Sequence, residues 1–144
     1  MYTIKKVEVW VGDIRNRPGM LARVLEGLTS AGAQLEFLIA RRVTENTSRV
    51  FLAPLKGVKQ KRAANEVGLV PAVAMHSLRI EGPDRAGLGA EVSRAVGDQG
   101  LNIRGVSAAA VGRKTVFYLA FEKEEETKTA AKILRKLLGK KRRR

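Results

Sequence analysis

The stretch NRPGMLARVLEGLTSAGAQL at residues 16–35 recurs, without a gap, as DRAGLGAEVSRAVGDQGLNI at residues 84–103. Apolar residues within each stretch recur at the spacing of an amphipathic helix. Each stretch also has a glycine just before that helix and another where it should end in a left-handed conformation, namely Gly19 and Gly32, and Gly87 and Gly100. A repeated turn, helix length and helix stop indicate a duplicated module of roughly seventy residues.

Strand patterns flank both helices. Before the first helix, Val7, Val9 and Val11 alternate with other residues, which predicts a strand over 5–12. Trp10 also makes the second face of that strand apolar, which favours an oligomer. In the first copy we expect a helix at 19–31, strands at 34–43 and 49–55, a helix at 58–66 and a strand at 69–74. In the second copy we expect a strand at 75–82, a helix at 87–99, strands at 101–111 and 115–122, and a helix at 125–138.

The element order predicts an α+β fold made of two tandem ferredoxin-like βαββαβ units, each an antiparallel sheet with its helices on one face. We expect the first domain at 1–73 and the second at 74–138. The second copy lacks a final strand, because only a basic tail at 139–144 follows its last helix.

Composition excludes several kinds of chemistry. The chain of 144 residues has no cysteine and one histidine, His76, without a carboxylate cluster beside it in sequence, so we expect neither a metal site nor a cofactor. No nucleophile and base pair appears in the sequence, which argues against an enzyme. No apolar run approaches the roughly 20 residues that span a bilayer, and Met1 leads into a strand-like pattern without a signal core. A cytoplasmic location is therefore the default expectation.

The net charge of +14 favours contact with polyanions. The run Lys140 to Arg144 supplies five of these charges. The alternative function for this chain is therefore nucleic-acid association through a basic surface and this tail. No pattern of exposed aromatic residues indicates base stacking, and a solvated terminus is the plainer interpretation of the tail.

The glycine at each helix start is the feature that points to a ligand. Backbone N–H groups at a helix N-terminus attract anions, and Gly19 or Gly87 lets a carboxylate approach closely. Asn102 starts the next strand, so we expect it to lie close to the 84–88 turn, where its amide would bind an ammonium group. Together these groups describe a site for an α-amino acid. The two glycines are equally consistent with a tight turn alone.

The spacing Asp84-Arg85-x-Gly87-Leu88 with Gly100-x-Asn102-Ile103 resembles the signature of the ACT domain, and the first copy resembles it in Arg17-Pro18-Gly19-Met20-Leu21 with Gly32-x-Gln34-Leu35. The resemblance implies regulatory modules that pair side by side and bind amino acids between domains. It departs from the usual pattern at Gln34 in the first copy and at Ala86 in the second, and Asn102 makes the second copy the better candidate. The ligand-binding residues implied are Asn16, Arg17, Pro18, Gly19, Met20, Leu21 and Gln34, and Asp84, Arg85, Ala86, Gly87, Leu88, Asn102 and Ile103.

The resemblance predicts a non-catalytic regulator. It would bind an amino acid or similar small effector, form a homo-oligomer, most simply a dimer, and pass an allosteric signal to a separate protein partner.

Overall fold

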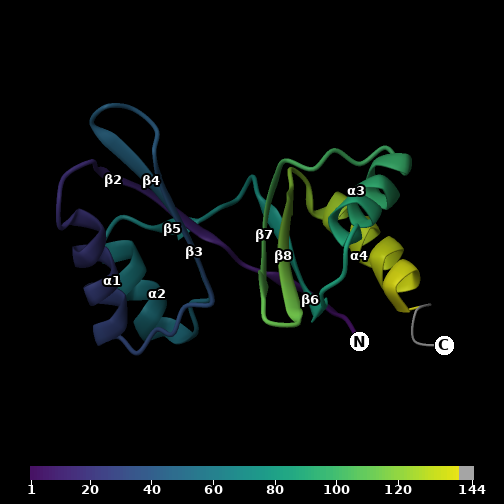
Figure 1. Cartoon of the computed structure of the whole chain (residues 1–144). Helices are drawn as coiled ribbons and strands as arrows, with labels where there is room; N and C mark the ends of the chain where they lie inside the picture. The colour runs from purple at the N-terminus through teal and green to yellow at the C-terminus, as the bar shows by residue number, and fades with distance from the viewer. Residues whose placement is uncertain (140–144) are drawn as a thin grey trace. The chain divides into compact units, whose positions relative to one another are not determined.

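The chain folds into two compact units, and the computed structural model describes residues 1–139 (Figure 1). Residues 8–72 form one unit, which we call the inserted unit. Residues 1–7 and the chain from residue 73 onward form the other, which we call the split unit. The inserted unit therefore interrupts the sequence of the split unit. The expected basic tail lies outside the described residues except for Gly139, which ends the last helix.

The inserted unit is a four-stranded antiparallel sheet with two helices on one side of it (Figure 1). The strand order is β3-β4-β2-β5. Trp10, Val24 and Leu28 lie in its core, so the strand-borne Trp10 and the apolar face of the first helix pack in one cluster. The elements are β2 (Trp10–Arg15), α1 (Met20–Ser30), β3 (Phe37–Arg42), β4 (Thr47–Ala53), α2 (Gly57–Glu66) and β5 (Val70–Pro71).

The split unit repeats this architecture with the order β1-β6-β8-β7 (Figure 1). Ile4 of its first strand is buried in the same core as Leu78 and Leu134. The elements are β1 (Thr3–Val7), β6 (His76–Pro83), α3 (Leu88–Asp98), β7 (Gly105–Val111), β8 (Lys114–Phe121) and α4 (Glu124–Gly139). The predicted α+β class with two ferredoxin-like units is confirmed.

The first strand is where the structure departs from the expected division at residue 73. A single strand was expected over 5–12, but β1 ends at Val7 and β2 begins at Trp10. Because Ile4 packs in one core and Trp10 in the other, an apolar stretch that looks continuous serves two sheets. The split unit is therefore not short of a strand: β1 pairs antiparallel with β6, as β5 pairs with β2.

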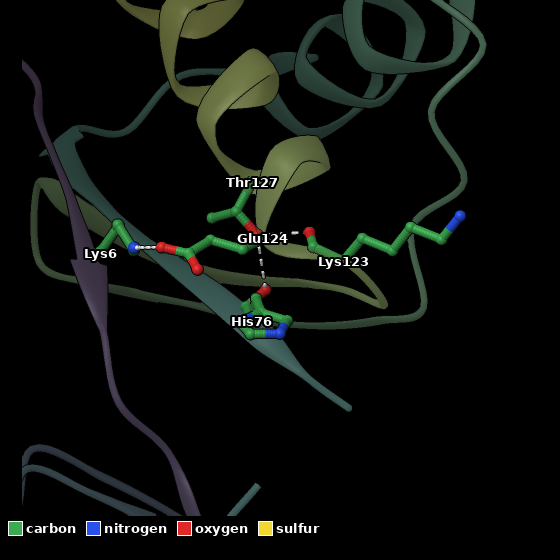
Figure 2. Close-up of polar contacts among 5 residues, drawn as sticks. All are labelled: Lys6, His76, Lys123, Glu124 and Thr127. Atoms are coloured by element: carbon green, nitrogen blue, oxygen red, sulfur yellow. Dashed lines mark hydrogen bonds and ion pairs between the residues drawn. The ribbon is translucent and has the colours of Figure 1, made fainter. Parts of the chain in front are cut away.

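Polar contacts tie β1 to α4 at the edge of the split sheet. Lys6 Nζ lies 2.6 Å from Glu124 Oε2, at the start of α4 (Figure 2). Arg135, further along α4, donates to the carbonyl of Ile4 at 3.0 Å. The Thr127 hydroxyl is 3.3 Å from the carbonyl oxygens of both His76 and Lys123, which joins α4 to β6 (Figure 2). Within residues 1–139, no helix has the length and apolarity to span a membrane.

Candidate functional site

The N-terminus of α3 presents backbone donors without a capping side chain. Gly87 precedes the helix with φ 83°, a left-handed conformation that glycine adopts without strain. The Leu88 N–H donates to the Arg85 carbonyl at 3.3 Å, and the Glu91 N–H donates to the Gly87 carbonyl at 2.9 Å. The intervening N–H groups of Gly89 and Ala90 have no partner within the helix, as expected for its first turn. They point out of the helix end together with its positive dipole, which suits a carboxylate.

The inserted unit repeats this turn at α1. Gly19 has φ 86°, the Met20 N–H donates to the Arg17 carbonyl at 3.2 Å, and the Arg23 N–H donates to the Gly19 carbonyl at 3.0 Å. The difference lies at the next residue, because Leu21 of α1 stands where α3 has Gly89. Leu21 packs partly against the core, whereas Gly89 adds no side chain to the helix entrance. The α3 entrance is therefore the less obstructed of the two.

Different groups fix the two turns. The backbone N–H of Asn16 donates to the Asn46 carbonyl at 2.8 Å, and its side-chain amide donates to the Glu45 carbonyl at 3.0 Å. Its Oδ1 also accepts from the Ser48 hydroxyl at 3.4 Å. Within residues 1–139, Asp84 has the backbone contact alone, from its N–H to the Arg113 carbonyl at 2.8 Å. Neither side chain caps the helix that follows it.

The 84–88 turn is held instead by contacts from Tyr2, which precedes β1, and from α3. The Tyr2 hydroxyl donates to the Pro83 carbonyl at 2.7 Å. The Arg85 guanidinium is paired with the Glu91 carboxylate in the first turn of α3. Bonding to Glu91, followed by smaller effects including bonding to Tyr2, raises the pKa of Arg85. Arg85 is thus occupied within its own unit.

Asn102 lies at the other end of α3, which overturns the expectation that it lies near the turn of its own unit. Gly105, which begins β7, is in register with Ala120, and Ala120 is in register with Ser77 near the start of β6. The 84–88 turn follows the opposite end of β6. With 11 residues, α3 separates the two by roughly 16 Å. The expectation was wrong because Asn102 lies between the end of α3 and the start of β7, whereas the 84–88 turn precedes the start of α3.

Gln34 follows α1 in the same way, three residues before β3. Gln34 and Asn102 are both exposed. Among the other expected ligand residues, Leu88 is buried in the core and Ile103 packs against it, so these side chains contribute to packing. Arg17, Pro18 and Ala86 are exposed, and Met20 is half-buried.

A groove in the inserted unit had no signal in the sequence patterns. It has a volume of 440 Å³ and lies between the second half of α1 and the segment leading into β3. It lies at the Gln34 end of α1, because Ala33 and Leu35 both line it. The complete lining consists of Leu25, Leu28, Thr29, Ala33, Leu35, Glu36, Phe37 and Leu38.

No group of three or more His, Cys, Asp and Glu side chains within residues 1–139 is placed to hold a metal ion. The polar groups at the helix entrances are backbone donors and exposed or ion-paired side chains. This arrangement can bind an anion and orient it.

Known proteins are similar to this chain in two ways: solved structures match the fold of both units, whereas a family model matches the sequence of part of the split unit. Solved structures of similar fold include protein BT0572 from Bacteroides thetaiotaomicron, 14% identical, with 90% of this chain and 88% of that chain covered and a TM-score of 0.77. The regulatory subunit of aspartate kinase from Thermus thermophilus, in a ligand-free form, is 17% identical, with 94% and 96% covered and a TM-score of 0.70. The aspartokinase alpha and beta subunits are 18% identical, with 96% and 97% covered and a TM-score of 0.64.

At these identities the likeness concerns the fold alone. No curated protein matches the chain by sequence. Residues 76–139, which form most of the split unit, match the family model of the ACT domain.

Proposed function

We propose that this chain is a non-catalytic regulatory protein that binds an amino acid at the N-terminus of α3. The observation that carries the proposal is the uncapped entrance of that helix, where Gly87 is left-handed and Gly89 adds no side chain. A ligand carboxylate would accept from the N–H groups of Gly89 and Ala90. The match of residues 76–139 to the ACT domain supports this assignment.

The ammonium group of the ligand would be bound by Asn102 of a second chain. The strands β6 and β7 both run antiparallel to β8, so they are parallel to each other. β7 is an edge strand, and its Val106 and Val111 side chains are 60% and 76% exposed. If two β7 edges pair antiparallel about a two-fold axis, the start of one lies beside the end of the other. Asn102 would then approach the 84–88 turn of the other chain.

The regulatory role follows from this shared site. A ligand bound by two chains favours the paired state over separate chains, and a partner protein that reads pairing would receive the signal. One of the similar structures is the regulatory subunit of an aspartate kinase, and another contains the alpha and beta subunits of an aspartokinase. Both support the proposal that this chain acts on a separate protein.

Gly89→Asp tests the carboxylate site. The new side chain would place a carboxylate at the α3 N-terminus, where an added Cβ meets the Phe117 ring at the ordinary contact distance of 3.7 Å. The Tm should therefore be largely preserved, and ligand binding should be lost. A thermal-shift screen of the twenty amino acids should give one or a few that raise the Tm of the natural chain and leave G89D unmoved. The matched control is Gly97→Asp, near the C-terminal end of the same helix, where an added Cβ meets nothing within 4 Å. G97D should keep the ligand response.

Mixing two defective chains tests whether the site is shared. G89D and Asn102→Ala should each bind nothing alone. A heterodimer of the two restores one intact site, because it pairs the natural turn of one chain with the natural Asn102 of the other. In an equimolar mixture that exchanges chains at random, about half of the dimers are heterodimers with one intact site of two, so about a quarter of the natural ligand binding should return by calorimetry. No response to any amino acid at millimolar concentration would exclude the proposed function, whereas binding without rescue by mixing would exclude only the shared site.

A further inference from the structure

The exposed face of α4 carries a row of cations that the proposed amino-acid site does not use. Lys128, Lys132 and Lys136 are exposed and succeed one another four residues apart, so they lie along one face of the helix. Arg135 lies beside them and uses one N–H to bind the Ile4 carbonyl. We call these four residues the α4 basic face.

Helix stability accounts for only part of this row. A cation in the last turn complements the helix dipole, and Lys136 is in that position. Lys128 is four residues from Glu124, and it helps to lower the pKa of that carboxyl, to which Lys6 contributes most. Lys132 has lysines four residues away on both sides, and like charges at this spacing repel. The row is therefore electrostatically unfavourable unless a counter-charge lies outside the chain.

The sequence continues the same charge beyond the helix. No acidic residue follows Glu126, and nine of the last eighteen residues are Lys or Arg, including Lys140 to Arg144. The acidic side chains of α4 are confined to its first turn, at the opposite end of the helix. A polyanion would therefore contact α4 from Lys128 onward and avoid its acidic first turn.

We propose that the α4 basic face binds the phosphate backbone of a nucleic acid without sequence preference. A membrane surface fits less well, because a helix at a lipid interface inserts an apolar face. The apolar face of α4, formed by Ala130, Ala131, Leu134 and Leu138, is buried in the core. The helix offers no aromatic side chain for base stacking. Contacts are thus limited to phosphates, which gives steep salt dependence.

The test measures binding of the full chain to a fluorescent DNA duplex of about 20 base pairs over a range of salt concentrations. The triple variant K128Q/K132Q/K136Q should bind about tenfold or more weakly at low salt, and the slope of log K against log salt should fall by about 3. The variant removes repulsion within α4, so it should fold normally by circular dichroism. The matched control is K59Q/K61Q/R62Q, which removes three exposed cations from α2 of the inserted unit.

The control should keep most of the affinity if the α4 basic face is the site. An equal loss in both variants would show that net charge alone drives binding, and it would overturn the proposal. Salt-insensitive binding or no binding to the duplex would overturn it too. So would binding to phosphatidylserine vesicles without binding to the duplex. None of these results depends on amino-acid binding at α3.

Discussion

The inserted unit and the split unit reach one spatial strand order by different chain orders. In the inserted unit the last strand, β5, follows the second helix and pairs with β2 through Trp10 and Pro71. In the split unit β1 comes first in the chain and pairs with β6 through Lys6 and Leu78. Trp10 and Leu78 are equivalent positions of the repeat, so β1 stands where β5 stands. The split unit is therefore a circular permutation of the inserted one.

The two ways of supplying the last strand differ in how firmly it is attached. β5 has two residues and continues directly from the loop after α2, so the chain itself keeps it in place. β1 has five residues, and the whole inserted unit separates it in sequence from the rest of the split unit. It carries anchors that β5 lacks, the Lys6–Glu124 ion pair and the bond from Arg135 to Ile4. A displaced strand needs contacts of its own because its neighbours in sequence do not hold it.

Deleting residues 1–7 is the change with the largest expected effect. It uncovers the core face that Ile4 fills, worth about 2 kcal/mol, and removes the β1–β6 hydrogen bonds, worth about 1 kcal/mol each. This sum approaches the whole stability of a small domain, so the split unit should unfold while the inserted unit stays folded. Hydrogen exchange should show lost protection in β6 and β8 and native protection in β2 and β4.

The chain has internal reporters for this comparison. Its single tryptophan, Trp10, is in the inserted unit, and both tyrosines, Tyr2 and Tyr118, are in the split unit. Tryptophan fluorescence of the deletion variant should keep its native unfolding transition, while the near-UV tyrosine signal of Tyr118 should be lost. Simultaneous loss of both signals would contradict the independence of the two units.

Each unit has a glycine that faces the residues leading into its outer strand, β5 in the inserted unit and β1 in the split unit. An added Cβ at Gly12 would lie 2.5 Å from the Gly68 carbonyl oxygen and 2.7 Å from Leu69 Cδ2. At Gly82 it would overlap the ring of Tyr2, a side chain rather than backbone, which can shift at the cost of its hydrogen bond to the Pro83 carbonyl. Gly12→Ala should therefore destabilise its unit by about 3 kcal/mol and Gly82→Ala by about 1 kcal/mol. Urea unfolding followed by tryptophan for G12A and by tyrosine for G82A measures both. A larger cost at Gly82 would mean that the Tyr2 ring is held more rigidly than backbone.

The fold was predictable where one unit is continuous in sequence. The two glycine turns and the helices between them are local, and their positions in the structure follow the repeat closely. The break at Glu8 and Val9 was not predictable from alternation, because each half of the stretch is apolar toward a different sheet. Pairing of β1 with β6 joins residues at least 70 positions apart, such as Val7 and Ser77, and no local pattern encodes it.

The site was predictable only at its backbone. The glycines at the helix starts and the left-handed Gly32 and Gly100 at the helix ends follow from the sequence spacing. The lack of a side-chain cap at each helix start does not, because Asn16 and Asp84 are residue types that favour an N-cap. The hydrogen bond from Tyr2 to Pro83 was not predictable, because Tyr2 leads into the displaced strand β1. The position of Asn102 was not predictable either, because it depends on which end of the sheet β7 begins at, and the pairing of β7 with β8 determines that.

The two turns differ by one side-chain anchor, which predicts a smaller effect. Asn16→Ala removes the bonds from Asn16 to Glu45 and Ser48, and it should cost the inserted unit about 1 kcal/mol. Asp84→Ala removes no side-chain hydrogen bond within residues 1–139, so the split unit should change by less than about 0.5 kcal/mol. Tryptophan-detected and tyrosine-detected urea unfolding should show this contrast. Equal costs would mean that the Asp84 carboxylate has a role in the turn beyond its backbone contact.

The smallest expected effect concerns one carboxylate in each sheet. Bonding to Arg49, directly across from it in β4, lowers the pKa of Asp13, and bonding to Arg79 lowers the pKa of Glu81. A lowered folded-state pKa means that each ionised carboxylate stabilises its unit above the ordinary pKa, which is near 4. This stabilisation is lost as the pH falls through the folded-state value. Both units should therefore lose stability between pH 5 and pH 2, and Asp13→Asn and Glu81→Gln should each flatten that loss.

The two pairs should differ in their response to salt. The Arg49 and Asp13 side chains are 44% and 47% exposed, so their pair is weak and should weaken further in concentrated salt. Arg79 is only 14% exposed and also bonds the Tyr118 hydroxyl at 3.0 Å, so its pair is better shielded from ions. In urea unfolding at pH 7, raising the sodium chloride concentration should shrink the stability difference between the natural chain and D13N more than the difference between the natural chain and E81Q, part of which comes from the exposed Lys114. Equal salt sensitivity would show that the Arg79–Glu81 pair is as accessible to ions as the Arg49–Asp13 pair.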